Sequence, residues 1–113
     1  MFPLLQALYQ QKWFYRLVCD RWTELRADGL VEDLFNTVTA AMRDYKAAFD
    51  RNYARWPVWG TLTNGLTTEN AKAFRSQADA VRYLFRWIAG RVAWIDGRLG
   101  YVGQEDFSAW FRE

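Results

Sequence analysis

Apolar residues recur every three or four positions along three stretches of the chain, the spacing that places side chains on one face of an α-helix. The first stretch runs from Pro3, a residue type favoured in the first helical turn, to Leu25. The second runs from Val31 to Trp56, and Pro57 ends it because the residue before a proline is driven out of the helical conformation. Its core-facing stripe is predicted to comprise Phe35, Val38, Met42, Tyr45, Phe49, Asn52 and Trp56.

The third stretch shows the same spacing and contains one internal glycine. It is predicted to begin at a cap supplied by Thr67 or Thr68, with Glu69 in its first turn, and to run to Leu99. Gly90 costs about 1 kcal/mol relative to alanine inside a helix, and its missing side chain would let another backbone approach closely. The remaining residues predict a short last helix that carries the aromatic residues Phe107, Trp110 and Phe111.

These elements predict an all-α fold of three long helices plus a short C-terminal helix, arranged like an antiparallel bundle. The Gly-, Asn- and Thr-rich segment 58–68 is typical of a loop between helices. A chain of 113 residues suits one domain and not two. We therefore expect residues 1–113 to form a single helical domain, with residues 100–113 as a C-terminal extension.

The composition narrows the classes of partner. The formal net charge is only +2, and basic and acidic residues are interspersed, which argues against a nucleic-acid-binding surface. Aromatic residues make up 19% of the chain, and each buried ring removes about 150–250 Å² from water, so rings alone could stabilise a small core. No apolar run approaches the roughly 18 residues that span a membrane, and the N-terminus has no signal-peptide pattern. We expect neither nucleic acid nor a membrane as a partner.

The residue types also limit the chemistry. Histidine is absent and Cys19 is the only cysteine, which excludes Ser-His or Cys-His nucleophiles, an internal disulfide and a thiolate metal cluster. The adjacent acids Glu32-Asp33 and Glu105-Asp106 would point about 100° apart on a helix, so neither pair converges on one metal ion or proton. We predict no catalytic, cofactor-binding or metal-binding residue in this chain.

Arginine and aromatic residues cluster in RNYARWPVWG, residues 51–60. Such a cluster can bind sugars, nucleobases or phosphates, or it can fix a helix end in a core. Because Trp56 continues the apolar stripe, we expect its ring to be buried. Tyr53 and Trp59 remain as candidate exposed recognition residues, and Trp110 is a third ring that could join them on one concave face.

Asp96 lies on an otherwise apolar helix, close in sequence to Arg91 and Arg98. It could serve as a site carboxylate together with Arg91, or as an ion pair that holds the helix end. Charges beside a packed face are normally paired, which favours the ion pair. For Arg51 and Arg55 the expected partners are acids such as Asp20, Asp50 or Asp96.

Three Arg/Trp-rich segments provide a more specific signal, namely DRWTELR, AFDRNYARWP and LFRWIAGRVAWIDGRL. Their order and spacing, over about residues 10–99, resemble the C-terminal region of the spore coat protein H (CotH) kinase family. Ile95 departs conservatively from the leucine usual in that family. The matching positions are Arg21, Trp22, Leu25, Arg26, Arg51, Asn52, Arg55, Trp56, Trp87, Arg91, Trp94, Ile95 and Asp96.

The resemblance implies the helical end of the large lobe of an atypical protein kinase. Members of that family use ATP and a divalent metal to phosphorylate Ser residues of proteins such as spore coat components, and others occur in secreted and cellulosome-associated bacterial proteins. The family's nucleotide-binding lysine and metal-binding aspartates lie upstream of the matched region, so no catalytic residue carries over. The chain alone is therefore predicted to be inactive and to bind no cofactor.

As partners, the resemblance implies a kinase lobe outside this chain or self-association through an apolar patch, and as location a bacterial spore coat or a secreted protein. A second hypothesis is a free-standing helical module that binds a protein or a carbohydrate. Catalysis by Asp96 with Arg91 is a third.

Overall fold

The computed structural model describes residues 2–61, 69–103 and 105–112, and within them the chain is helical with no strand. The all-α class is therefore confirmed. The elements are α1 (Pro3–Tyr9), α2 (Lys12–Ala27), α3 (Leu30–Asp44), α4 (Lys46–Arg55), η1 (Glu69–Ala73), α5 (Gln77–Leu99) and η2 (Ser108–Trp110), of which η1 and η2 are short 3₁₀ helices.

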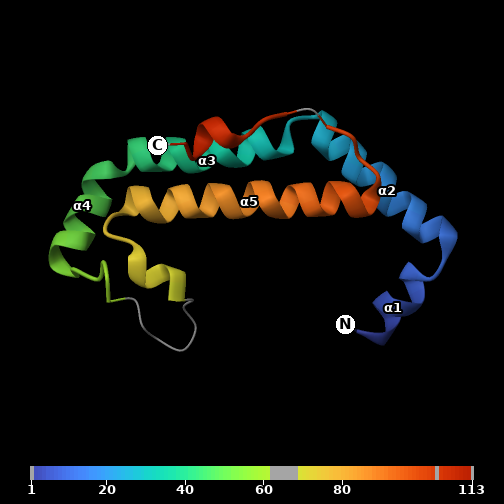
Figure 1. The fold of residues 1–113 in the computed structure, drawn as a ribbon, viewed down its shortest axis with the longest axis horizontal. Helices are drawn as coiled ribbons and strands as arrows, with labels where there is room; N and C mark the ends of the chain where they lie inside the picture. The colour runs from blue at the N-terminus through green and yellow to red at the C-terminus, as the bar shows by residue number, and fades with distance from the viewer. Residues whose placement is uncertain (1, 62–68, 104, 113) are drawn as a thin grey trace.

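The first two predicted helices are each divided in two. The first breaks at Gln11, whose backbone is extended (φ −86°, ψ 122°) and separates α1 from α2. The second breaks at Tyr45 (φ −109°, ψ 17°), where α4 turns away from the line of α3 (Figure 1). Apolar spacing alone cannot show these bends, because it continues across both of them.

The third predicted helix begins later than expected. Ser76 caps α5, its hydroxyl accepting a hydrogen bond from the backbone N–H of Asp79 at 3.2 Å. The Asp79 carboxylate in turn accepts from the backbone N–H of Arg75, the residue before the cap, at 2.9 Å. Glu69 belongs to η1 instead of the first turn of α5, and the predicted caps Thr67 and Thr68 lie outside the described residues.

The core lies between α3 and α5, which run antiparallel side by side, and the C-terminal segment covers it (Figure 1). The ring of Phe35 contacts Phe85 at 4.5 Å between centroids, and Phe107 and Trp110 at 5.7 and 5.3 Å. The described residues after Gly100 thus return to the core, and they form the 3₁₀ turn η2 where a short last helix was expected.

Two predictions about packing are wrong. Trp56 is 58% exposed and not buried, because the bend at Tyr45 carries the end of α4 away from the core. Gly90 is exposed, and a side chain built there would meet nothing within 4 Å, so no other backbone of the described residues approaches it.

The molecule is elongated and open. Its radius of gyration is 17.9 Å, against about 13 Å for a compact domain of this length. Its accessible surface is 8684 Å², against about 6,500 Å² for a compact monomer of this mass. Figure 1 shows why: α1 and η1 lie near opposite ends of α5, on the side away from α3, and cover little of it.

Candidate functional site

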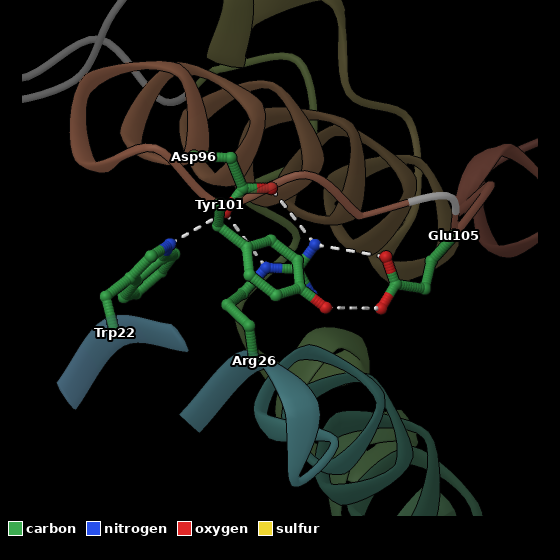
Figure 2. Close-up of polar contacts among 5 residues, drawn as sticks. All are labelled: Trp22, Arg26, Asp96, Tyr101 and Glu105. Carbon is green, nitrogen blue, oxygen red and sulfur yellow. Dashed lines mark hydrogen bonds and ion pairs between the residues drawn. The ribbon is translucent and has the colours of Figure 1, made fainter. Parts of the chain in front are cut away.

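A buried ion pair between α2 and α5 is the most organised polar site of the described residues. Arg26 is only 3% exposed, and its Nε and Nη2 donate to the two oxygens of Asp96, both at 3.0 Å. Trp22, one helical turn before Arg26, donates its indole N–H to Asp96 Oδ1 at 2.7 Å. Figure 2 shows both α2 side chains converging on the one carboxylate.

The C-terminal segment completes this site from the other side. Arg26 Nη2 also donates to Glu105 at 3.4 Å, and the hydroxyl of Tyr101 donates to the second oxygen of Glu105 at 3.3 Å (Figure 2). The guanidinium lies over the rings of Tyr101 and Phe107, at 4.7 and 5.5 Å from their centroids. A side chain at Gly103 would collide with Glu105 and Tyr101, so the loop needs glycine to pass this closely.

These contacts set the charge state of the site. Burial alone would lower the pKa of Arg26, but the hydrogen bonds and charge of Asp96, and then the charges of Glu105 and Tyr101, raise it above its ordinary value. Desolvation, followed by the negative charge of Glu105, raises the pKa of Tyr101. At neutral pH, Arg26 is therefore a cation and Tyr101 a neutral hydrogen-bond donor.

The arrangement suits a structural lock better than catalysis. The Asp96 carboxylate already accepts three hydrogen bonds from Trp22 and Arg26, so both of its oxygens are engaged by groups of the protein itself. The ion pair expected for Asp96 is present, but its partner is Arg26 of α2 and not Arg91 or Arg98 of its own helix. This lock, formed by Trp22, Arg26, Asp96, Tyr101 and Glu105, joins two helices that are far apart in sequence, α2 and α5.

Other motif residues of the first and third segments lie on the surface. Arg21 forms an exposed ion pair with Glu24 at 3.0 Å. Trp87 and Trp94 are largely exposed, and the guanidinium of Arg91 lies 4.6 Å from the centroid of the Trp94 ring. The structure therefore brings Trp22 and Asp96 together. The other four residues lie outside the lock, namely Arg21, Trp87, Arg91 and Trp94.

The second segment lies on α4, away from the lock. Arg51 and Asn52 are exposed, and Arg55 stacks on the exposed ring of Trp56 at 5.3 Å. Two of the three acids predicted to pair with Arg51 or Arg55 pair with other cations instead. Asp50 pairs with Lys46 on its own helix, and Asp96 pairs with Arg26.

The candidate recognition residues Tyr53 and Trp59 pack against each other. Their ring centroids are 4.7 Å apart at an interplanar angle of 43°, and both side chains are half-buried. Trp110 lies in the core against Phe35, so the three rings do not share one exposed face. Among these residues the structure thus provides no flat platform for a sugar.

Sequence reasoning missed Tyr101, Glu105 and the role of Arg26 as the centre of the lock. In the sequence, Glu105 stands out only as one member of the adjacent acidic pair Glu105-Asp106. Its contact with Arg26 depends on the path of the loop after Gly100, for which the sequence carries no periodic signal.

In the described part of the chain, no group of three or more His, Cys, Asp or Glu side chains is placed to hold a metal ion, and no helix there is long and apolar enough to cross a bilayer. No family model, curated protein or solved structure matches the chain. The resemblance to the CotH family therefore stays a prediction that rests on the three sequence segments.

Proposed function

We propose that this chain is a structural helical domain that docks onto a protein partner and contributes no catalytic group of its own. The observation that carries the proposal is the large surface. The chain exposes 8684 Å², about 2,200 Å² more than a compact monomer of its mass would. Burial of such an excess by each partner corresponds to the interfaces of obligate complexes, about 2,000–5,000 Å² in total.

The side chains on this surface support docking. Exposed large apolar residues lie on α1, α2, α3 and α5, and on α1 and α2 they include Leu4, Trp13 and Leu17. Large exposed apolar patches are rare on monomers and typically mark interaction sites. The apolar stripe of the first predicted helix therefore has a function in this proposal, although the chain itself does not bury it.

For the partner, we propose a kinase lobe of the type found in the CotH family. The support is that Trp22 and Arg26, from the first segment of the resemblance, contact Asp96 from the third segment. Three of the residues that carry the resemblance, from the first and third segments, thus form one polar cluster, which supports the view that these two segments belong to one structural unit. In this proposal the lock holds α2 and α5 in the arrangement that the partner recognises.

The docking proposal is tested with the purified chain alone. We expect an apolar fluorescent dye such as anilinonaphthalene sulfonate to bind it while far-UV circular dichroism still shows a folded helical protein. Sedimentation velocity is expected to show association that increases with protein concentration. A folded monomer that binds no dye would overturn the proposal, because a docking domain without its partner must expose the docking surface.

The proposal that the docking partner is a kinase lobe has a separate test. Sequencing the coding region upstream of Met1 is expected to reveal an in-frame segment with a nucleotide-binding lysine and metal-binding aspartates, or a neighbouring gene that encodes them. Absence of both would refute the kinase lobe as partner and leave the docking proposal untouched.

A further inference from the structure

Helix α5 carries a second apolar stripe besides the one that faces the core. Residues 84, 87, 91, 94 and 98 follow the three-and-four spacing and therefore share one face of the helix. Leu84, Trp87 and Trp94 on this stripe are 40%, 56% and 54% exposed. At 1.5 Å per residue the stripe is about 21 Å long, which matches about four turns of a partner helix. A helix with apolar residues on two faces is typical of one that is covered on both.

A cleft beside the stripe extends the surface. It has a volume of about 730 Å³ and lies between the C-terminal half of α5 and the α1–α2 region, with Tyr9 and Tyr15 on one side and Trp94 and Leu99 on the other. The Tyr15 hydroxyl donates to the backbone carbonyl of Arg98 at 2.8 Å, which connects α2 to this part of α5. The stripe is thus continuous with a concave apolar surface, as a docking site for a side chain requires.

The charge on this surface is positive only. Arg91 and Arg98 both lie over the ring of Trp94, at 4.6 and 5.3 Å from its centroid. Among the described residues, no carboxylate pairs with either guanidinium, and none lines the cleft. The nearest acid in sequence, Asp96, is already bound by Arg26. The two cations are therefore available to a partner.

We propose that the stripe Leu84-Trp87-Arg91-Trp94-Arg98 of α5 binds an acidic amphipathic helix of a protein partner. Apolar residues of that helix pack on Trp87 and Trp94, and carboxylates about two turns apart meet Arg91 and Arg98. A second copy of the same stripe fits less well, because it would bring four guanidinium groups together without a carboxylate. The inference rests on the proposed docking function and names the chemistry of the docked segment.

The experiment uses two synthetic probe peptides of about four helical turns. One has leucine at the a and d heptad positions and glutamate elsewhere, and the other has lysine in place of each glutamate. We expect fluorescence anisotropy of the labelled peptides to show binding of the glutamate peptide, weakened by salt, and little binding of the lysine peptide. Equal binding of the two peptides would overturn the inference, because then charge plays no part.

Two variants locate the site. Trp94→Ala is expected to weaken binding of the glutamate peptide by about thirtyfold, the usual effect of truncating a central interface tryptophan. Arg91→Glu combined with Arg98→Glu is expected to reverse the preference in favour of the lysine peptide. The matched control is Trp56→Ala on α4, since Trp56 is equally exposed and also lies under an arginine, Arg55. It should bind like the parent chain.

The outcomes separate this inference from the docking proposal. If the glutamate peptide does not bind, but the chain still binds dye and associates, the inference falls and the docking function stands. If the chain associates with itself and Trp94→Ala abolishes that association, the stripe binds a second copy, and the acidic partner is refuted. Circular dichroism of each variant verifies that the exposed substitutions leave the helices intact.

Discussion

Arg26 shows how one buried charge can join two distant parts of a chain. Removing a guanidinium from water costs several kcal/mol, which is regained only if its hydrogen bonds are made. Asp96 supplies two of them and Glu105 a third, and the rings of Tyr101 and Phe107 cover the cation. Arg26 Nη1 has no protein partner although it is buried, so the lock already carries one uncompensated group.

Asp96→Asn is expected to destabilise the fold by about 3 kcal/mol, because it leaves the buried Arg26 without its counter-ion. Equilibrium unfolding in urea, monitored by circular dichroism, measures the change. Glu105→Gln is the matched control: its side chain is more exposed and its contact to Arg26 longer, so the expected loss is at most about 1 kcal/mol. Equal losses for the two variants would contradict the view that Asp96 is the main partner of Arg26.

At the residue scale, sequence could predict that Asp96 is paired, since a carboxylate on an apolar helix must find a cation. It could not identify the partner. Arg26, Arg91 and Arg98 were all available, and the choice depends on the approach of α2 to α5, a contact between positions 70 residues apart in the chain.

Helix α5 illustrates what decides where an element begins and ends. Its apolar spacing extends back to Phe74, yet the helix starts at Gln77 because Ser76 and Asp79 satisfy the free backbone N–H groups there. It ends at Leu99 because Gly100 adopts a left-handed conformation (φ 76°) and its N–H bonds back to Asp96. Capping residues, and not apolar periodicity, set both boundaries.

Gly90→Ala is expected to stabilise the domain by about 1 kcal/mol, because alanine is the better helix former and the new methyl group meets nothing within 4 Å. Thermal unfolding should show a rise of about 4–8 °C for a domain of this size. The control is Gly100→Ala, which also meets no atom but must adopt a positive φ, so a lower melting temperature is expected. A decrease for Gly90→Ala would mean that a partner backbone approaches there.

The whole molecule is less compact than its aromatic content suggested. Among the residues that the structure describes, the buried core cluster comprises Val31, Phe35, Phe85 and Val92, and several tryptophans remain on the surface. The bends at Gln11 and Tyr45 turn α1 and α4 away from the α3–α5 pair, so among the described residues neither helix contributes a side chain to the core cluster.

The purified chain is expected to transfer no phosphate from ATP, since the proposed function is structural. Release of labelled inorganic phosphate and labelling of a Ser-containing protein substrate, each in the presence of Mg²⁺, measure this. The control is the same assay with a known protein kinase added. Phosphate transfer above background that is lost in the Asp96→Asn variant would contradict the proposal that the chain has a purely structural function.

The sequence by itself determined the helical class, the termination of α4 before Pro57 and the pairing of Asp96, because these depend on local periodicity, backbone restriction and the cost of an unpaired charge. Only the tertiary structure decided that Trp56 is exposed, that Tyr53 and Trp59 stack on each other, and that Arg26 is the centre of the lock. Periodicity states which face of a helix is apolar. Whether another element covers that face depends on where the chain bends, and two backbone conformations, at Gln11 and Tyr45, settle that for α1 and α4.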